Sequence, residues 1–508
     1  MKAIRIIGRS SRLSLIQMEK VKQKIRQQFP EAIITLVPRS SKGDALQDVP
    51  LQTVEGTDFF TQEIFDALRK NDADIAVHSL KDMSGEHFFS ENRFAVVDRD
   101  ETRDIAIFHP NILSKLKEGA TITIGTCSPR REEMAIGFLQ KALPQTGSFK
   151  IKTAFIRGNV DTRLRKLDSG EYDGIILAVA GLNRLLESKE DAGLIRLLLN
   201  DKKLMLLPLV ECVPAPCQGA IVAEAHPKNK EAVAIVNAIN NMNLMQDCVQ
   251  EKKAGLQYGA GCLQRFGVTT LHYGKGKSIL YAAGRNNSGD EFTEWKVLPK
   301  QLDPTKRLFS STDHMGHFFE YEFFDTSISF PEPIAYIANY KALQKDAITT
   351  SLKNKKIWAS GTKTWFEIAK KGLWVEGCAD AMGIEFLKSV WKQPLTEVKQ
   401  ELVRIISHQQ AVSNWQEKGW KASATYKLKE QVKPGLSIQL QQADAIFWTS
   451  FQQYQLYHKI LKKDVQHLCP SGETAQLLKA AGIKPTVFPN IKAFNQWRNY
   501  SSRLLNVD

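Results

Sequence analysis

The chain has 508 residues, of which 43% are hydrophobic and 24% are charged, and its formal net charge is +14. Since an ordinary domain holds about 100–150 residues, this length favours about three to five globular domains. No apolar run is long enough for a membrane-spanning helix, and the first residues enter a strand pattern without a signal-peptide core, so we expect a cytoplasmic protein.

The excess of positive charge suits nucleic acid, a membrane surface or small acidic ligands. Dense Lys/Arg tails with interleaved aromatic residues would favour nucleic acid, and the sequence has none. The seven cysteines, at 127, 212, 217, 248, 262, 378 and 469, are odd in number and form no CxxC pair. We therefore expect free thiols in a reducing compartment, and neither disulfides nor a structural metal site.

Along the first 225 residues, short apolar strands alternate with amphipathic helices, which is typical of an α/β fold with mostly parallel sheets. The strands include IRIIG, ADIAVHS, TITIGT, AFIRG and GIILAVA. A new unit begins near residues 225–230, with helices through EAVAIVNAI and MQDCVQEKKAG and strands FGVTTLHY and SILYAAGR. Another α/β stretch follows the FPEPI break at 330–334.

Four strand-to-helix junctions share one chemistry: IGRSSRLS, IAVHSLKD, IGTCSPRR and IRGNVDTR. Each places small or hydroxyl residues and at least one Lys or Arg where a helix begins. A single Ser or Asp there is usually only a helix cap. Because helix N-termini carry unpaired N–H donors, and ligands settle beyond the carboxyl ends of strands in open α/β sheets, the four together predict a cleft for a small polyanion.

The junction HSLKD adds a carboxylate, Asp82, beside Lys81. A carboxylate among cations stays ionised and cannot itself bind an anion. It can stabilise a developing cation or relay protons. A surface Lys–Asp pair or a helix cap is the alternative.

In the stretch YGAGCLQRFG, Cys262 lies next to glycines and precedes a strand-like run. Glycines there allow close backbone approach or positive φ. A packed core thiol, a nucleophile and an attachment point all remain open for Cys262. Two other motifs are read as structural: GKGKS at 274–278 as a hairpin turn, and HMGH at 314–317 as histidines with no completed metal site.

These junctions, in this order, resemble those of hydroxymethylbilane synthase, also called porphobilinogen deaminase, over roughly residues 3–300. The matching segments are VHSLKD, RGNVDTRLRKLDSGEYDGIILAVAGLNRL, PAPCQGA and GAGC. The resemblance implies an enzyme that condenses four porphobilinogen molecules into linear hydroxymethylbilane with release of ammonia. It also implies a dipyrromethane cofactor bound through a thioether to Cys262.

The resemblance assigns further residues. Asp82 matches the catalytic aspartate, and Phe60 matches a residue of the active-site lid. The positions that match cofactor- or substrate-binding residues are Arg9, Ser11, Ser79, Lys81, Thr126, Ser128, Arg130, Arg131, Arg157, Gly158, Arg163, Arg184 and Gln218. The chain departs from the family pattern at Thr57 and Asp58, which replace Lys-Gly in the lid.

The implied fold has two lobes like those of a periplasmic binding protein, a small α/β third domain and a C-terminal α/β domain. We expect the first lobe at 1–102 and 206–228, the second at 103–205, and the cofactor-carrying third domain at 229–325.

Residues 326–508 resemble part of uroporphyrinogen-III synthase, in IWASGTKTWFEIAKKGLWVEGCADAMG, IFWTSFQQY and CPSGETAQLLKAAGIKPTVFPN. That family usually has two α/β lobes in roughly 250 residues, so one lobe is expected to be missing or reduced here. Ser360, Thr362, Thr449 and Ser450 are candidate carboxylate-binding residues, with helix capping as the alternative. The alternative function is therefore a bifunctional enzyme that also closes the bilane ring.

Two rival interpretations come from other classes. A non-catalytic anion-binding protein explains the cationic junctions but neither Asp82 nor Cys262. A nucleic-acid binder is favoured by net charge alone, and steep salt dependence would identify it. We expect a monomer whose partner is a small polycarboxylate, with no nucleic-acid or membrane partner.

Overall fold

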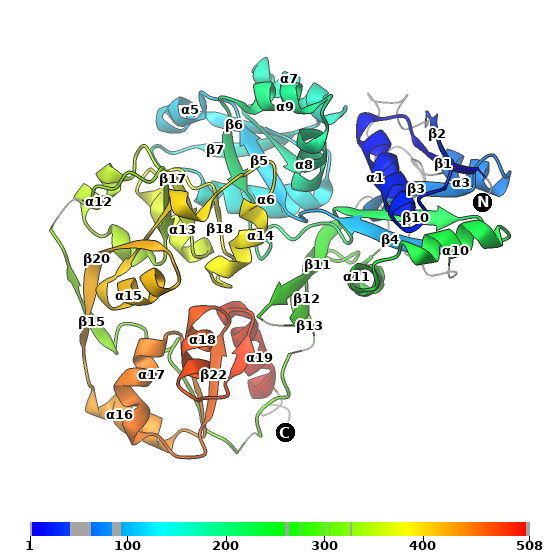
Figure 1. Cartoon of the computed structure of the whole chain (residues 1–508). Coiled ribbons are helices and arrows are strands. Elements are labelled where there is room, and N and C mark those ends of the chain that lie inside the picture. Colours follow the sequence, from blue (N-terminus) through cyan, green and yellow to red (C-terminus); the bar gives the residue numbers. More distant parts are fainter. Residues whose placement is uncertain are drawn as a thin grey trace.

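The computed structural model describes residues 3–40, 62–83, 93–259, 264–274, 276–296, 298–303, 305–325 and 328–503. Its strands form five sheets, and helices pack against them, so the chain has a mixed α/β fold (Figure 1). No helix among these residues combines the length and the apolar character that a membrane crossing requires.

The first lobe is built on sheet A, in the order β2-β1-β3-β10-β4. Its strands are β1 (Ile4–Arg9), β2 (Ile34–Arg39), β3 (Ile75–Ser79), β4 (Phe94–Arg99) and β10 (Ala220–Ala225). β1 runs parallel to β2 and β3, whereas β10 runs antiparallel to β3 and β4. Helices α1 (Arg12–Gln28), α3 (Gln62–Arg69) and α10 (Lys230–Ala238) accompany it. The buried face of α1 recurs at Ser14, Gln17, Met18, Val21 and Ile25, the spacing of one helical face.

The second lobe is built on sheet B, in the order β7-β6-β8-β5-β9. Its strands are β5 (Asp104–Phe108), β6 (Thr121–Gly125), β7 (Lys150–Ala154), β8 (Gly174–Ala178) and β9 (Lys203–Leu206). Its helices are α5 (Ile112–Glu118), α6 (Pro129–Ala142), α7 (Val160–Asp168), α8 (Val179–Glu187) and α9 (Ala192–Leu199). Two hinge segments, residues 100–103 and 207–219, connect sheets A and B.

A three-stranded antiparallel sheet, sheet C, follows the long helix α11 (Met242–Tyr258). Its strands are β11 (Arg265–Tyr273), β12 (Lys277–Arg285) and β13 (Glu291–Lys296). The register pairs Tyr273 with Lys277, which confirms that the GKGKS motif belongs to a hairpin turn. One face of sheet C packs with residues of α11, and the other faces the second hinge segment.

The C-terminal region holds two sheets. The inner C-terminal lobe contains sheet E, in the order β15-β20-β19-β16-β17-β18. Its strands are β15 (Phe319–Phe323), β16 (Ile334–Ile337), β17 (Lys356–Ala359), β18 (Gly377–Cys378), β19 (Val403–His408) and β20 (Lys421–Glu430). Its helices are α12 (Asp346–Ser351), α13 (Thr362–Lys370), α14 (Lys388–Trp391) and α15 (Gln409–Glu417).

The outer C-terminal lobe contains sheet D, a parallel sheet in the order β14-β21-β22-β23. Its strands are β14 (Leu308–Ser310), β21 (Ala445–Phe447), β22 (Gln466–Pro470) and β23 (Thr486–Phe488). Helices α16 (Pro434–Gln442), α17 (Phe451–Tyr457), α18 (Glu473–Ala480) and α19 (Ile491–Arg503) accompany it.

The C-terminal region holds two sheets, whereas the sequence suggested that one lobe is missing or reduced. Strands β14 and β15 add an edge strand to each of the two sheets. Both strands precede residue 326, so the expected limit of the third domain, 229–325, includes strands of the C-terminal sheets. Their pairing partners β21 and β20 lie more than 100 residues further along the chain, as the paired residues Leu308–Ala445 and Phe319–Glu430 show, and no local pattern reveals them.

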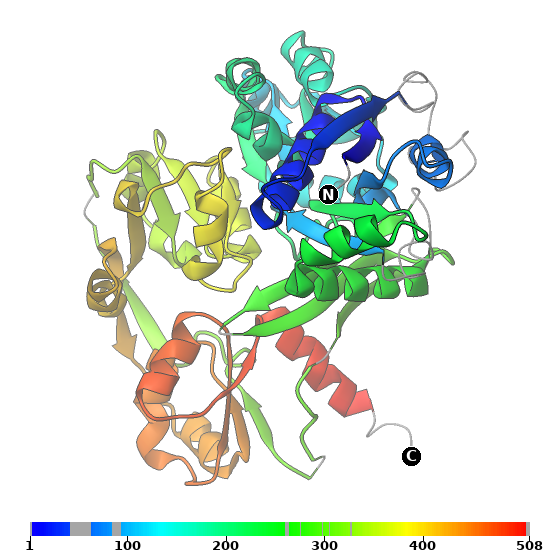
Figure 2. The same cartoon turned by 45° about the vertical axis from the view of Figure 1, so that its right-hand side comes forward.

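The inner C-terminal lobe lies beside the second lobe (Figures 1 and 2). Buried residues of the two lobes form common hydrophobic clusters. The Trp365 ring meets that of Phe138 edge-on at 5.1 Å, and its Nε1 donates to the carbonyl oxygen of Ala142 at 3.0 Å. Trp374 Nε1 donates to the carbonyl of Leu204, and Leu206 N donates to Glu376 O at 2.7 Å. The edge of sheet B therefore continues into the inner C-terminal lobe.

Candidate active site

The carboxyl ends of strands from the first and second lobes carry the predicted hydroxyl groups. Ser11, Ser79 and Ser128 precede α1, the short 3-10 helix Leu80–Asp82 and α6, respectively. None of these three side chains makes a capping hydrogen bond to its helix. The first N–H groups of the helices are therefore not satisfied by these serines, and helix termini of this kind are suited to bind anions.

Lys81 and Asp82 stand at the end of β3, where charges from both lobes act on them. The Lys81 side chain is accessible to solvent but lies deep among protein atoms, so desolvation lowers its pKa. The positive charges of Arg131 and Arg130 lower this pKa further, whereas Asp82 and Asp104 oppose the shift. The charge of Lys81, in the first lobe, therefore interacts with the charges of Arg131 and Arg130 in the second lobe.

A buried carboxylate, Asp104, holds the two consecutive arginines of α6. Arg130 Nη2 and Arg131 Nη2 each donate to Asp104 at 2.8 Å, and Gln218 Nε2 donates at 2.9 Å. Burial alone would raise the pKa of Asp104, but the charges of Arg130 and Arg131 hold it well below its ordinary value. Asp104 therefore stays ionised and neutralises one of the two arginine charges.

The remaining donors of the two arginines are also partly used. Arg130 Nη1 donates to Val213 O at 2.8 Å, and Arg131 Nη1 donates to Ile176 O at 3.2 Å. Arg131 Nε is buried and has no hydrogen-bond partner among the described residues. Both arginines match cofactor- or substrate-binding positions in the sequence, and here they are 4% and 8% exposed and bonded to Asp104. Sequence reasoning missed Asp104, and its only signal was an acidic residue opening the buried strand DIAIF.

A second group of cations lies beside Arg131. Burial lowers the pKa of Arg163, and the charges of Arg131 and Arg157 lower it further, against the opposite effect of Cys127. Arg163 Nε donates to Gly158 O at 2.8 Å. Gly158 has φ +115°, and a Cβ there would lie 3.0 Å from Thr162 Cγ2, so the turn needs a glycine. Three guanidinium groups that repel one another make a site that carboxylates would stabilise.

The side chains of two other predicted binding residues, Arg184 and Gln218, bond to the hinge segments. Arg184 is 3% exposed and donates to Gly219 O, and burial lowers its pKa against the influence of Asp100, Asp98 and Glu187. Gln218 donates to Thr102 O at 2.6 Å as well as to Asp104. Both side chains join the lobes. Thr126 is buried and accepts from Ser128 N at 3.2 Å, while Arg9 ends β1 and is half-buried.

Phe60 and Cys262 lie outside the described residues, and so do Thr57 and Asp58. The described residues nearest to Cys262 are Gly259 and Gln264. Gly259 has φ +150°, and a Cβ there would meet Asn287 Oδ1 at 2.2 Å. Arg265 pairs with Arg285, whose Nε contacts Glu133 Oε1 of α6 at 2.5 Å. The described strand that follows, β11, belongs to sheet C, and sheet C contacts α6 through Arg285 and Glu133.

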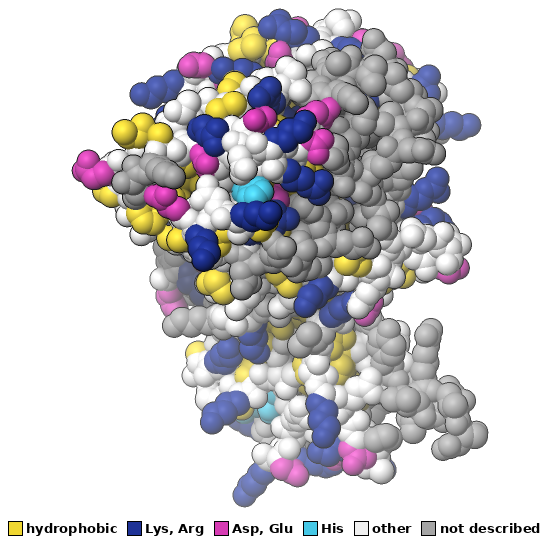
Figure 3. Space-filling model, turned by 90° about the vertical axis from the view of Figure 1, so that its right-hand side faces the viewer, with side chains coloured by type: hydrophobic (Ala, Val, Ile, Leu, Met, Phe, Trp, Pro, Cys, Tyr) yellow, Lys and Arg dark blue, Asp and Glu magenta, His cyan; other side chains and the backbone are white. Residues whose placement is uncertain are grey.

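On the face drawn in Figure 3, Lys and Arg side chains are interspersed with Asp and Glu, and the described residues visible there form no continuous basic stripe. Within the described part of the chain, no group of three or more His, Cys, Asp or Glu residues could hold a metal ion.

Comparisons with known proteins find a matching family and a related enzyme. Residues 4–234 match the family model described as "Porphobilinogen deaminase, dipyromethane cofactor binding domain". The porphobilinogen deaminase of Streptococcus sanguinis (strain SK36) is 34% identical over 266 residues, which cover 52% of this chain and 80% of that protein.

Two solved structures share weaker similarity. A periplasmic substrate-binding protein of an ABC transporter from Coxiella burnetii is 15% identical, with a TM-score of 0.25, over 49% of this chain and 96% of that one. The uroporphyrinogen-III synthetase of Helicobacter pylori 26695 is 12% identical, with a TM-score of 0.26, over 39% of this chain and 100% of that one. At these TM-scores, neither likeness supports a conclusion about this chain.

Proposed function

The chain belongs to the porphobilinogen deaminase family, and from that premise we propose that Cys262 carries the dipyrromethane cofactor through a thioether and that Asp82 is its catalytic carboxylate. The activity is that of a hydroxymethylbilane synthase, a transferase of tetrapyrrole (haem) biosynthesis. It joins four porphobilinogen molecules into hydroxymethylbilane and releases one ammonia for each.

The charges of the cleft fit a polycarboxylate cofactor and substrate. Each pyrrole unit carries an acetate and a propionate, so the growing chain gains two negative charges at every step. Arg131, Arg157 and Arg163 lie close enough for their charges to depress one pKa, and bound carboxylates would relieve that repulsion. When bound, the two-ring cofactor supplies the free pyrrole carbon to which the first substrate unit is joined.

Asp82 would act on the charge that develops in each cycle. As the carbon–nitrogen bond of the aminomethyl group breaks, ammonia leaves and the pyrrole ring becomes cationic. A carboxylate that accepts from the pyrrole N–H stabilises that cation. A new carbon–carbon bond then forms, and the attacked ring carbon loses its proton. Lys81 and the arginines would hold the substrate carboxylates meanwhile.

The observation that carries this proposal is that Lys81, next to Asp82 in the first lobe, lies close enough to Arg130 and Arg131 of the second lobe for their charges to lower its pKa. The test is Asp82→Glu, which keeps the charge but moves it by one methylene. We expect kcat to fall about 100-fold or more while the mass of the covalent cofactor is retained. The exposed Asp72→Asn change in the same lobe is the control and should leave kcat unchanged. Near-normal turnover by the Asp82→Glu variant would refute the role.

A second candidate function, closure of the bilane ring, is favoured by one observation. The C-terminal region holds two lobes, each with its own sheet, which is the number of α/β lobes that the resemblance to uroporphyrinogen-III synthase implies. Its predicted hydroxyl groups are nevertheless engaged locally: Ser450 is part of the capping box of α17, and Thr449 Oγ1 bonds with Gln453 Oε1 at 3.0 Å. Ser360 Oγ lies 3.1 Å from Thr364 Oγ1.

The isomer of the oxidised porphyrin product distinguishes the two functions. With porphobilinogen as the sole substrate, type I porphyrin would mean deaminase activity alone, and type III would mean that the C-terminal region also closes the ring. A monomer, a cytoplasmic location, and the absence of nucleic-acid or membrane partners stay predictions from the sequence.

A further inference from the structure

Asp380, in the inner C-terminal lobe, reaches the hinge between the first and second lobes. Its side chain is fully buried and accepts two hydrogen bonds, from Arg103 Nη2 at 3.1 Å and from Val210 N at 3.2 Å. The backbone that presents it is unusual, because Asp380 and Ala381 both have positive φ, 50° and 58°. Such a conformation costs free energy in a non-glycine residue and persists only where the surroundings enforce it.

The two partners of Asp380 belong to different hinge segments. Arg103 ends the first segment, residues 100–103, and Val210 lies in the second, residues 207–219. Asp100 N donates to Gly219 O at 3.1 Å, so the two segments also bond each other directly. One carboxylate of the C-terminal region therefore bonds to both hinge segments. Any relative movement of the first and second lobes must bend these two segments.

The hinge segments are continuous with the cationic side of the cleft. Asp104, the next residue after Arg103, binds both Arg130 and Arg131. Arg130 also donates to Val213 O, which lies three residues beyond Val210 in the same hinge segment. A shift of either hinge segment would thus move the arginines that face Lys81 and Asp82.

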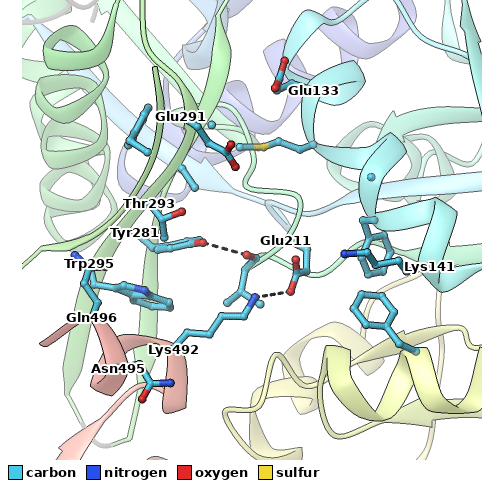
Figure 4. Close-up of a pocket in the computed structure, with 18 of the residues that line it drawn as sticks. Glu133, Lys141, Glu211, Tyr281, Glu291, Thr293, Trp295, Lys492, Asn495 and Gln496 are labelled. Carbon is cyan, nitrogen blue, oxygen red and sulfur yellow. Dashed lines mark hydrogen bonds and ion pairs between the residues drawn. The ribbon is translucent and has the colours of Figure 1, made fainter. Parts of the chain in front are cut away.

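Sheet C and α19 also contact the second hinge segment (Figure 4). Lys492 of α19 pairs with Glu211, and Tyr281 of sheet C donates to Val210 O at 3.1 Å. These residues line a cavity of about 770 Å³ where α6, sheet C, α13 and α19 meet. Met382 and Ala493 pack with Leu209, Val210 and Val213 in one apolar cluster.

The contact at Asp380 depends on the balance of three buried charges. Arg103 is also paired with Glu101 at 3.0 Å, and all three charged side chains are at most 8% exposed. Buried charges are tolerated when each has a partner of opposite sign, and removing one partner is strongly unfavourable. Arg103 also lies over the ring of Phe386 at 5.0 Å, a second contact with the inner C-terminal lobe.

We propose that Asp380 is a positioning residue for the deaminase reaction: it fixes both hinge segments through Arg103 and Val210 and so holds Arg130 and Arg131 opposite Asp82. This inference rests on the proposed function of the cleft. It assigns to the C-terminal region a part in the chemistry of the first two lobes, independent of any ring closure.

The test is Asp380→Asn in the full-length protein. Asn tolerates positive φ and can still accept from Val210 N, but it removes the charge opposite Arg103. We expect kcat for porphobilinogen consumption to fall about tenfold while KM stays within about twofold, because the substrate still binds in a cleft whose catalytic alignment has loosened. The covalent cofactor mass and the melting temperature are measured on the same sample.

Two further variants complete the experiment. Glu397→Gln removes an exposed pair with Arg196 that also joins the second lobe to the inner C-terminal lobe, and its kcat should not change. Arg103→Lys keeps the charge but loses the guanidinium geometry, so it should lower kcat as Asp380→Asn does. If Asp380→Asn does not fold, the kcat of Arg103→Lys tests the inference.

A folded Asp380→Asn or Arg103→Lys variant with kcat within about twofold of the unsubstituted protein would overturn the inference. A lowered melting temperature with unchanged kcat would do the same, since it would mean a purely structural contact. Neither result would affect the roles of Cys262 and Asp82, which the cofactor mass and the Asp82→Glu variant test separately.

Discussion

Arg103 and Asp380 form a buried ion pair at 3.1 Å, although 277 positions separate them along the chain. Their side chains are 3% and 0% exposed. Together with the shared hydrophobic core, this pair makes the C-terminal region a structural part of the deaminase lobes. Substitutions in either part should therefore affect the other.

Asp104→Asn should destabilise the protein and reduce its activity. The change leaves Arg130 and Arg131 buried without their carboxylate, and breaking such a pair costs about 3–5 kcal/mol. Urea unfolding measures this loss of unfolding free energy. A change below about 1 kcal/mol would mean that the two arginines are not held as described.

The same carboxylate predicts how stability responds to acid. The pKa of Asp104 is lowered in the folded state, so its contribution is complete above the unfolded pKa of about 3.9 and is lost as the pH falls through the folded value. The difference in unfolding free energy between the unsubstituted protein and Asp104→Asn should therefore shrink as the pH is lowered below about 4. A difference that persists unchanged into strong acid would contradict the lowered pKa of Asp104.

Glu376 predicts the opposite response to pH. Burial raises its pKa to about 7, although Lys356 and Lys203 act against the shift. Between about pH 4.3 and the folded value, the folded state binds the extra proton, so stability falls as the pH rises. Relative to Glu376→Gln, the melting temperature of the unsubstituted protein should decline from pH 5 to pH 8.

The matched control for Glu376 is Glu385→Gln, an exposed carboxylate in the same lobe that pairs with Lys388. Its melting temperature should follow that of the unsubstituted protein across this pH range. Parallel curves for the Glu376→Gln and unsubstituted proteins would show that Glu376 ionises normally.

Trp365→Ala should lower the stability of the second lobe as well as that of the inner C-terminal lobe. The side chain is fully buried against Phe138 and donates to Ala142 O, and removing a buried Trp costs about 3–5 kcal/mol. Calorimetry should show one transition containing both lobes, shifted to lower temperature. Leu197→Ala, at a side chain 72% exposed, is the control. Two separate transitions, of which only one moves, would contradict the shared core.

The sequence predicted the parts of the site that depend on local pattern. The ends of strands β1, β3 and β6 could be located because apolar strands stop at polar residues there, and each is followed by a helix. The turn after Tyr273 could be located for the same reason. Lys81 and Asp82 stood out because they follow a strand end directly.

The parts that the sequence did not predict depend on distant partners. In the sequence, nothing distinguishes Asp104 and Asp380 from other acidic residues. The fold brings Arg130 and Arg131 to Asp104, and it brings Arg103 to Asp380. The edge strands β14 and β15 are short, and their pairing with β21 and β20 crosses the predicted domain limit. Arg184 resembled a cleft residue in sequence, but its position in α8 directs it to Gly219 O in the hinge.

The intact mass of the purified enzyme, compared with that of Cys262→Ala, tests the central proposal most directly. We expect the unsubstituted protein to exceed the mass of its polypeptide by one dipyrromethane unit, and peptide mapping to place that unit on Cys262. The Cys262→Ala protein should have the polypeptide mass alone and no turnover. A fully active enzyme with only the polypeptide mass, or an adduct that survives in Cys262→Ala, would contradict the account.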